Sequence, residues 1–524
     1  KVPRRTEIAE ALAGNLCRCG AYDGIFEGIQ AACTGAFDQT DDIAPPRTDA
    51  EVKVRGAAVY TADVQLPGML HVAMLRSSVG HGRVLSVELD AALKSSGVHG
   101  AYRFIRPGST IRFWGQELVA VAAESYDLAR QALDKIVVAV EERPVVASID
   151  AALDTNAPLI YAKDQRKEAS SAAEGPTFLG KWSGNLRGPM SMSIFTKPRR
   201  AVKIVQQSER DDELLLHRQR YQTHVQAHCS MEPHGCVAHW SDEGLKVWLS
   251  TQAVKIVADD IAERWELPKE KVQLFAEFVG GGFGSKAGAQ PELLTAVELS
   301  RQTGRPVKYI LRREEELIVG GIRPSTRVNA ALCDRSGKLE AIQLQGYSDS
   351  GVAIGSSVAT VPNILYPGVP KQIQDWDVVT NGPAGMAFRG PGGPAGLWAL
   401  EQAIDALAVR RGVDPLEYRT ANDSDPVRQR LFAWVAQQDL WKLRSTVPRR
   451  EGEWLIGVGM ATSAWMYILN PQSLVRLATT SAGGIVLSSA SQDMGNGTKA
   501  ALCWAVAEEL GMDRSRVEVR LGDS

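Results

Sequence analysis

The chain has 524 residues, of which 44% are hydrophobic and 23% charged, and its formal net charge is −2 at pH 7. This composition is ordinary for a folded protein of several domains, and it gives no electrostatic reason to expect nucleic acid or an anionic membrane as partner. No apolar run reaches the roughly 18 residues that a membrane-spanning helix needs, so the sequence predicts no membrane span.

The start of the chain predicts two short helices around a cysteine-containing turn. Helical runs over Thr6–Leu12 and Ile25–Ala32 flank Asn15-Leu-Cys-Arg-Cys-Gly20. Cys17 and Cys19 can direct two thiolates at one metal centre, which is half of a tetrahedral iron or zinc site, although plain packing is the alternative for an isolated pair. The acidic, proline-containing segment 38–50 then predicts an extended linker.

The cysteine count also bears on the compartment. Seven cysteines are odd in number and unevenly spaced, which argues against a disulfide framework and indicates a reducing environment. We therefore expect a cytoplasmic location. Because the chain starts at Lys1, and because the strand-like run Val517–Leu521 near its end has no evident partner, we also expect it to be a piece of a longer protein.

The remainder predicts a mixed α/β, multidomain fold. Strands are expected at 70–75, 84–89, 118–123, 136–140, 245–250, 272–278, 307–311, 339–346 and 485–490, and helices at 126–135, 291–301, 396–411 and 498–510. The helix at 291–301 has proline in its first turn and Gly304 just beyond its end, the usual asymmetry of helix termini. The polar stretch 165–210 predicts an irregular connector.

Three glycine-rich loops lie between strand-like and helical runs. They are Phe278-Val-Gly-Gly-Gly-Phe-Gly-Ser-Lys286, Phe388-Arg-Gly-Pro-Gly-Gly-Pro394 and Ser491-Gln-Asp-Met-Gly-Asn-Gly497. Glycine lets the backbone approach a ligand closely, and helix N-termini favour anions. A tight structural turn is the alternative for any single loop, and the first matches neither a Walker A loop nor a Rossmann fingerprint. Three such loops together predict one large anionic ligand held from several sides.

A second candidate site is a cluster of metal-capable side chains. These are His224, His228, Cys229, His234 and Cys236. The spacing of His224 and His228 would suit zinc on a helix, but Pro233 and the strand-like character of the segment weaken that interpretation. Glu232, a carboxylate in a stretch otherwise short of acids, is a candidate functional residue, with a surface acid as the alternative.

Several motifs, taken in chain order, resemble those of the molybdenum hydroxylases, the xanthine dehydrogenase and aldehyde oxidoreductase family. They are Asn15–Gly20, Val54-Arg-Gly-Ala-Ala-Val-Tyr-Thr-Ala-Asp63, Thr251-Gln252, Gly280–Lys286, Ala387-Phe-Arg-Gly390 and Gln492–Gly497. The resemblance implies the end of a helical [2Fe-2S] domain (1–37), the linker (38–50), an α/β-hammerhead domain (51–165), a first molybdopterin-binding domain (166–425) and the start of a second (426–524).

The resemblance also implies roles for individual residues. Cys17 and Cys19 would ligate the iron–sulfur cluster, Gln252 would hydrogen-bond an oxygen ligand of molybdenum, and Glu232 would face the substrate. The remaining cofactor contacts would come from Gly281, Gly282, Phe283, Gly284, Arg389, Met494, Gly495 and Asn496. The implied cofactors are molybdenum on a molybdopterin, with or without a nucleotide, and a [2Fe-2S] cluster.

Departures from the family pattern limit which catalytic base, substrate and further cofactor we expect. The family's general-base glutamate has no equivalent before Ser524, so no catalytic base is named. Pro391 stands where purine oxidisers place an aromatic side chain, which disfavours xanthine as substrate. The cysteine module, residues 1–37, runs through the linker directly into the hammerhead-like segment, so we expect no FAD on this chain. We expect FAD or another electron-transfer group on a further subunit.

The leading hypothesis is an oxidoreductase that hydroxylates an aldehyde or an N-heterocyclic carbon with oxygen from water and passes electrons through [2Fe-2S]. One alternative is a non-catalytic electron-transfer or assembly partner with the same fold. The other is a zinc-dependent hydrolase that uses the histidine cluster.

Overall fold

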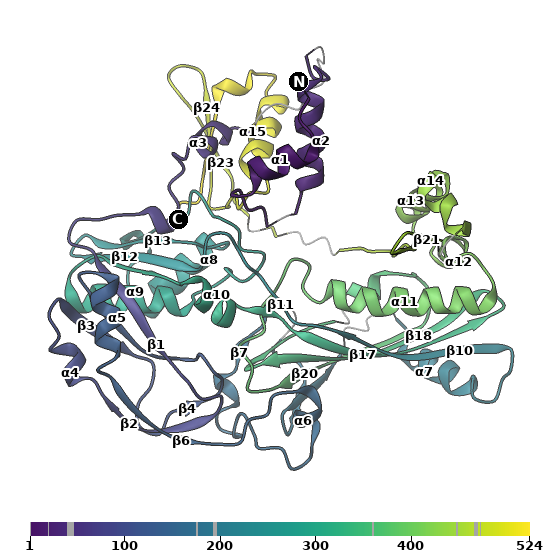
Figure 1. Cartoon of the computed structure of the whole chain (residues 1–524), viewed down its shortest axis with the longest axis horizontal. Helices are drawn as coiled ribbons and strands as arrows, with labels where there is room; N and C mark the ends of the chain where they lie inside the picture. The colour runs from purple at the N-terminus through teal and green to yellow at the C-terminus, as the bar shows by residue number, and fades with distance from the viewer. Residues whose placement is uncertain are drawn as a thin grey trace.

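The computed structural model describes residues 2–18, 20–38, 47–173, 177–191, 196–358, 361–446, 449–465, 470–471 and 473–524. Helices and strands alternate along this described part of the chain, and the strands form seven sheets. The predicted mixed α/β, multidomain fold is therefore confirmed. Figure 1 shows a broad main body with smaller units standing above it.

The cysteine module forms two helices as predicted. Helix α1 spans Arg5–Leu12 and α2 spans Tyr22–Cys33. Cys19 and residues 39–46 of the expected linker lie outside the described residues. The chain resumes at Arg47 and forms the short helix α3, Ala50–Val54.

One half of the main body is a seven-stranded sheet with the order β14-β13-β12-β15-β1-β5-β3. Its strands are β1 Leu70–Arg76, β3 Val98–Arg103, β5 Glu117–Ala123, β12 Gly235–Ser241, β13 Gly244–Leu249, β14 Val272–Phe275 and β15 Val307–Ile310. Helices α8, Val254–Arg264, and α9, Pro291–Thr303, pack on it and close a core rich in valine, alanine and leucine. Strands that precede and strands that follow the domain boundary predicted at residue 165 therefore belong to one sheet.

A smaller layer covers the N-terminal strands of that sheet. It consists of the three-stranded sheet β4-β2-β6 with helices α4 and α5. Their bounds are β2 Gly82–Glu88, β4 Thr110–Ile111, β6 Val137–Glu142, α4 Asp90–Leu93 and α5 Tyr126–Leu133. The elements predicted between residues 70 and 140 are thus present.

The other half of the body is a six-stranded sheet with the order β10-β17-β18-β20-β9-β8. Its strands are β8 Lys181–Ser183, β9 Leu186–Met190, β10 Leu214–Thr223, β17 Ser325–Arg335, β18 Lys338–Gly351 and β20 Lys371–Val379, and helices α7, Pro198–Gln207, and α11, Gly393–Arg411, pack on it. The prediction that 165–210 is irregular was wrong. The segment supplies strands β8 and β9 of this sheet and an amphipathic helix, α7, whose Ala201, Ile204 and Val205 are buried.

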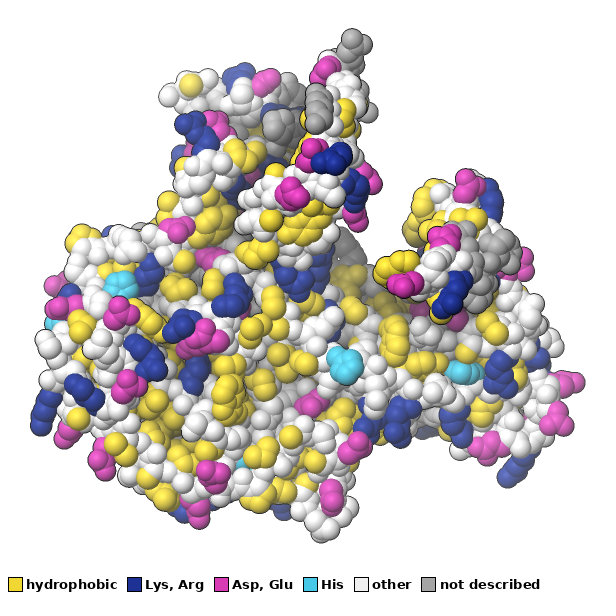
Figure 2. Space-filling view, viewed as in Figure 1, with side chains coloured by type: hydrophobic (Ala, Val, Ile, Leu, Met, Phe, Trp, Pro, Cys, Tyr) yellow, Lys and Arg dark blue, Asp and Glu magenta, His cyan; other side chains and the backbone are white. Residues whose placement is uncertain are grey.

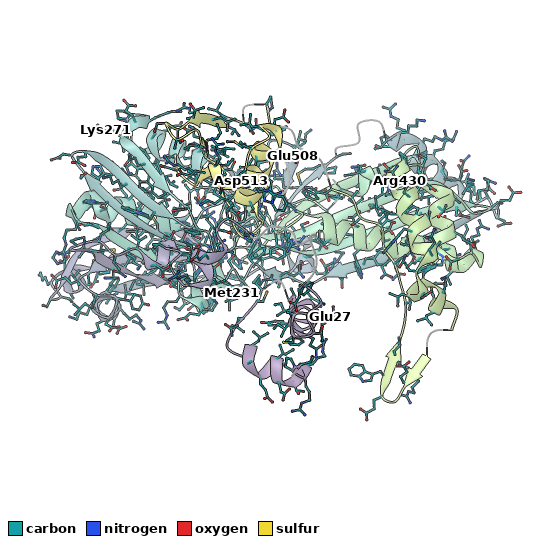
Figure 3. The ribbon with its side chains drawn as sticks, turned by 90° about the horizontal axis from the view of Figure 1, so that it is seen from above. Glu27, Met231, Lys271, Arg430, Glu508 and Asp513 are labelled. Atoms are coloured by element: carbon teal, nitrogen blue, oxygen red, sulfur yellow. The ribbon has the colours of Figure 1, made fainter. Side chains whose placement is uncertain are left out.

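The C-terminal domain is a small sheet covered by one helix. Strands β23 Arg476–Thr479, β24 Ile485–Ser489 and β25 Val517–Leu521 form it, with α15, Thr498–Glu509, packed against β25. The expectation that Val517–Leu521 lacks a partner was wrong, because it pairs in parallel with β24. Figure 1 shows α15 of this domain and helices α1 and α2 above the main body, and in Figure 3, seen from above, Glu508 and Asp513 are offset from Glu27.

The remaining elements are short connectors or an outlying helical unit. They are α6 Ile149–Leu153, β7 Ser170–Ser171, β11 Gln226–Ala227, α10 Arg313–Val319, β16 Ile322–Arg323, β19 Ala353–Ile354, α12 Pro415–Asn422, α13 Pro426–Gln437, α14 Asp439–Lys442, β21 Arg449–Glu451 and β22 Trp454–Ile456. Among the helices of the described residues, none combines the length and apolar character that crossing a membrane requires.

Helix α11 offers a direct test of the packing under the six-stranded sheet. Ile404 is fully buried in its core, whereas Val409 on the same helix is 64% exposed. We expect Ile404→Ala to lower the free energy of unfolding by about 2–5 kcal/mol, because it leaves a cavity. We expect Val409→Ala to change it by no more than about 0.5 kcal/mol. Chemical denaturation of both variants measures the difference, and equal effects would contradict this packing.

Candidate functional site

The first glycine-rich loop, Gly280–Lys286, has a backbone that few sequences could adopt. Strand β14 ends at Phe275, earlier than predicted, and the loop that follows has positive φ at Gly281 (+93°), Phe283 (+54°) and Gly284 (+113°). A left-handed conformation at a bulky residue such as Phe283 costs about 1–3 kcal/mol and concentrates at functional sites. The strain marks this loop as a candidate binding element.

Helix entrances agree with the prediction at two of the three loops. Helices α11 and α15 begin directly after Gly392 and Gly497, which are left-handed N-caps. Helix α9 begins only at Pro291, so the first loop does not lead straight into a helix N-terminus. At this loop the anion-binding groups must therefore be amides of the loop itself.

Gln252 connects the first loop to the third. Its side-chain oxygen accepts a hydrogen bond from Gly284 N at 2.8 Å, and its Nε2 lies 3.1 Å from the sulfur of Met494. A Cβ on Gly282 would lie 2.3 Å from the Gln252 oxygen, so glycine permits this close approach. The structure thus brings together residues that are 242 positions apart in the sequence.

The second loop lies directly against the first. The amide of Arg389 donates to the carbonyl of Phe283 at 2.7 Å, and a Cβ on Gly284 would lie 2.3 Å from the carbonyl oxygen of Ala387. Arg323, which the sequence did not single out, donates to the carbonyls of Phe388 and Arg389 at 2.8 and 3.1 Å. Its guanidinium also lies 4.6 Å from the centre of the Phe388 ring, so it fixes this loop from behind.

The joined loops present hydrogen-bond donors without protein acceptors. Within the described residues, the amides of Gly281, Gly282 and Phe283 donate to no acceptor, and the exposed guanidinium of Arg389 has no partner. Successive unpaired amides beside an unpaired cation form a site for an anion. The residues present therefore fit a cofactor that carries negative charge and approaches the backbone closely.

The third loop is organised by an acid that the sequence did not single out. Asp493 accepts hydrogen bonds from the amides of Gly495, Gly497 and Lys499, at 2.9 to 3.2 Å, and pairs with Arg47 at 3.3 Å. Burial alone would raise the pKa of Asp493, but these amides and the Arg47 charge hold it below its ordinary value. An acid followed by Gly-x-Gly before a helix was the available signal. Met494, Gly495 and Asn496 lie in the turn that Asp493 holds.

The cysteine module contacts the first two loops through Arg18. The Arg18 Nε donates to the carbonyl of His228 at 3.0 Å. The guanidinium of Arg18 also lies 5.3 Å from the ring centre of Phe283 and 5.8 Å from that of Phe388. Cys17 is half-buried in this turn, where its amide donates to the hydroxyl of Tyr22. The other predicted ligand, Cys19, is outside the described residues.

The histidine cluster does not form a zinc site. The ring nitrogens of His228 lie 3.0 and 2.7 Å from the carbonyl oxygens of Gly321 and Ala387, and burial lowers its pKa. His234 contacts Glu316 at 2.9 Å and the carbonyl of Ser285 at 3.2 Å. Burial alone would lower the pKa of His234, but the hydrogen bond and charge of Glu316 raise it. No group of three His, Cys, Asp or Glu side chains in the described part of the chain could hold a metal ion, which speaks against the zinc hypothesis.

Glu232 lies beside the first loop. It is 8% exposed, and both carboxylate oxygens accept hydrogen bonds from the protein itself. The donors are the amide of Thr61 at 3.1 Å, the hydroxyl of Ser250 at 2.7 Å and the amide of Gly280 at 2.8 Å. The protein itself therefore supplies three donors to this carboxylate, and its contact with substrate stays a prediction.

Two cavities lie beside the loops. One, of about 400 Å³, is bounded by Arg389, Pro394, Leu397, Trp398 and Trp465 among its mostly apolar lining, which does not include Pro391. Figure 2 shows that the surface is hollowed between the cysteine module, which holds α1 and α2, and the helical unit of α12, α13 and α14 (Figure 1).

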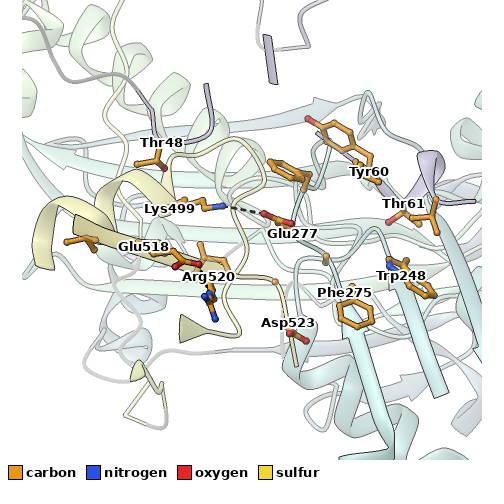
Figure 4. A pocket seen from close by; sticks show the side chains of 18 residues that line it. Thr48, Tyr60, Thr61, Trp248, Phe275, Glu277, Lys499, Glu518, Arg520 and Asp523 are labelled. Atoms are coloured by element: carbon orange, nitrogen blue, oxygen red, sulfur yellow. Dashed lines mark hydrogen bonds and ion pairs between the residues drawn. The ribbon is translucent and has the colours of Figure 1, made fainter. Parts of the chain in front are cut away.

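The other cavity, of about 580 Å³, lies between the segment around Tyr60, strands β13 and β14, and strand β25. In Figure 4 Lys499 and Glu277 face each other across it, and their charged atoms are 3.4 Å apart. Phe278 also lines it, so this cavity adjoins the residues that lead into the first loop.

The fold and the three loops fit a protein that would hold an anionic cofactor between its domains. Two segments, 205–423 and 436–524, match the molybdopterin cofactor-binding domain, and 55–105 matches the a/b hammerhead domain of aldehyde oxidase and xanthine dehydrogenase. The chain belongs to the molybdenum hydroxylases, the family of xanthine dehydrogenase and aldehyde oxidoreductase, as the sequence predicted.

Relatives and solved structures agree with that assignment. The aldehyde oxidoreductase molybdenum-binding subunit PaoC of Escherichia coli is 28% identical over 525 residues, covering 93% of this chain and 66% of its own. The nicotinate dehydrogenase large molybdopterin subunit of Eubacterium barkeri is 28% identical over 402 residues, covering 72% of this chain and 87% of its own. This chain thus spans about two thirds of the length of PaoC.

Two solved structures show the same fold. Quinoline 2-oxidoreductase from Pseudomonas putida 86 superimposes with a TM-score of 0.74 at 24% identity, covering 92% of this chain and 66% of that one. The aldehyde oxidoreductase from Desulfovibrio desulfuricans superimposes with a TM-score of 0.79 at 19% identity, covering all of this chain and 63% of that one.

The contact between the first two loops can be tested with glycine substitutions. Gly284 and Gly288 both have positive φ, but only Gly284 faces a neighbour, the carbonyl of Ala387. We expect Gly284→Ala to separate the loops and to lower both the melting temperature and the molybdenum content of the purified protein. We expect the control, Gly288→Ala, to show the smaller cost of backbone strain alone. Equal losses in the two variants would contradict the close approach.

A buried acid next to the site predicts a pH dependence. Burial raises the pKa of Glu292 from 4.5 to about 7, against the opposing effect of the nearby His234. The folded protein then binds more protons than the unfolded chain between these values, so this group's contribution to stability is lost as pH rises towards 7. Relative to wild type, Glu292→Gln should gain stability between pH 5 and pH 7. Thermal unfolding at several pH values measures this, with the exposed Glu417→Gln as control, and a constant difference would refute it.

Proposed function

We propose that this chain holds a molybdenum–molybdopterin cofactor in an oxidoreductase that hydroxylates an aldehyde or an N-heterocyclic carbon with oxygen from water. The observation that supports this most strongly is that three loops far apart in the sequence are joined: Gln252 contacts Gly284 of the first loop and Met494 of the third, and Arg389 N of the second loop donates to Phe283. Within the described residues, the first loop keeps unpaired amides and the Arg389 guanidinium has no partner. The relatives named above are molybdenum-binding or molybdopterin subunits of oxidoreductases, which supports the same conclusion.

Each loop has a distinct task under this proposal. The amides of Gly281, Gly282 and Phe283 donate hydrogen bonds to the anionic group, while Gln252 and Gly284 fix their positions. Arg389 offers a cation from the facing loop. The turn of Met494, Gly495 and Asn496, held by Asp493, closes the site from the C-terminal domain. The bound cofactor supplies the redox chemistry, and the protein supplies position and electrostatics.

We further propose a [2Fe-2S] cluster at Cys17 and Cys19, through which electrons leave the site. The stacking of Arg18 on Phe283 and Phe388 supports this, because it places the cysteine turn against two cofactor loops. FAD, or another electron-transfer group, would then be carried by a further subunit. The cytoplasmic location stays a prediction of the sequence.

The substrate pocket is proposed to be the cavity beside Arg389. Its apolar lining with Trp398 and Trp465 suits an aromatic or aliphatic aldehyde or a heteroaromatic ring. Pro391, in the same loop as Arg389, remains the predicted reason why xanthine is disfavoured.

Elemental analysis of cofactor-loaded protein tests the proposal. We expect about one molybdenum per chain in the wild type and iron in multiples of two. Gln252→Ala removes the acceptor of the Gly284 amide and the contact with Met494, and should lower molybdenum content at least about tenfold, the ratio that 1.4 kcal/mol of lost interaction gives. The control is Gln219→Ala, at an exposed position of β10.

Two outcomes of that analysis would overturn the proposal. Wild-type protein without molybdenum, purified from its native source, would favour the alternative of a non-catalytic electron-transfer or assembly partner. An equal molybdenum content in the Gln252→Ala variant and the wild type would show that Gln252 does not help to hold the cofactor.

A further inference from the structure

A buried ion pair lies directly beneath the first cofactor loop. Lys286 is 1% exposed, and its ammonium lies 3.8 Å from the Glu232 carboxylate. The same ammonium donates to the hydroxyl of Ser250 at 2.6 Å and to the backbone carbonyl of Glu232 at 2.7 Å. Ser250 in turn donates to the carboxylate at 2.7 Å, so the three side chains form one closed network.

This network holds both ends of the loop. At the first residue, Gly280 donates to the Glu232 carboxylate at 2.8 Å, and Glu232 N donates back to the Gly280 carbonyl at 3.1 Å. At the last residue, the Lys286 side chain returns to Glu232, and the Lys286 carbonyl accepts from Gln252 N at 2.8 Å. Glu232 therefore holds the two ends of the loop, Gly280 and Lys286, at a fixed separation.

The packing allows little movement at this anchor. A Cβ on Gly280 would lie 2.4 Å from the Cβ of Glu232, so the two backbones are in close contact. The second oxygen of Glu232 accepts from Thr61 N, which ties the segment after α3 to the same point. Burial lowers the pKa of Lys286 to about 8, partly offset by the Glu232 charge, so the ion pair depends on both partners.

We propose that Glu232 and Lys286 act as a positioning pair. They set the ends of Gly280–Lys286 so that the strained segment between them directs its amides to the cofactor, without touching the cofactor themselves. This inference rests on the proposed function, because it assigns how the same loop is held. The substrate-facing role of Glu232 stays a separate prediction.

A buried pair has a characteristic response to substitution. Removing one partner leaves an uncompensated buried charge, whereas removing both takes away charge and counter-charge together. Glu232→Gln and Lys286→Met should therefore each loosen the loop, and the double variant should be less affected than the worse of the two. Ser250→Ala keeps both charges and should have the smallest effect, which provides a variant that folds if the others do not.

The experiment compares these variants by hydrogen–deuterium exchange on the full chain with its cofactor. We expect amides of residues 279–287 to exchange at least about tenfold faster in Glu232→Gln and in Lys286→Met, with a matching loss of molybdenum. The matched control is Asp377→Asn, another buried acid, which pairs with Arg187 at 2.7 Å and accepts from two backbone amides in the other half of the body. It should leave exchange in 279–287 unchanged.

The outcomes separate this inference from the function it rests on. Unchanged loop exchange in both single variants, or a double variant worse than the sum of the singles, would overturn the positioning pair. Faster exchange of the loop in the control would show a general loss of stability and would also overturn it. Faster loop exchange in variants of a protein whose wild type holds no molybdenum would overturn the proposed function alone.

Discussion

The arrangement of the site depends on one side-chain amide, that of Gln252. Its oxygen accepts from Gly284 in the first loop, and its nitrogen contacts Met494 in the C-terminal domain. Since Arg389 N donates to Phe283 in the same first loop, all three cofactor loops are connected through positions 283 and 284. A displacement of Gln252 would therefore alter the spacing between two molybdopterin-binding domains as well as one hydrogen bond.

Two costs accompany this arrangement, and both lie in the same few residues. Phe283 is held in a left-handed conformation, and Lys286 and Glu232 are buried as ions. Strained backbone persists only where the surroundings determine it, and buried ions are stable only when their partners are in place. The network beneath the loop supplies both conditions, and His234 adds a contact to the Ser285 carbonyl. The strained backbone and the buried charges lower stability here, and they hold the amide donors of the loop in fixed positions.

The sequence predicted the parts of this site that follow from local rules. The main helices and strands were found because their periodicity and end signals are local, and the glycine loops were found because glycine marks close backbone approach. The partners of these loops could not be predicted. Arg323, Asp493 and Arg18 act through contacts with carbonyls, amides and rings that are distant in sequence. Glu232 was recognised as unusual, but its partners Thr61, Ser250 and Gly280 could not be predicted, because only the fold brings them together.

The most direct test of this account is a crystal structure of the cofactor-loaded protein with data collected at the molybdenum absorption edge. The account predicts one strong anomalous peak per chain beside Gln252, enclosed by the loops of Phe283, Arg389 and Met494. A molybdenum peak elsewhere in the chain, or loops that converge around no metal, would contradict it.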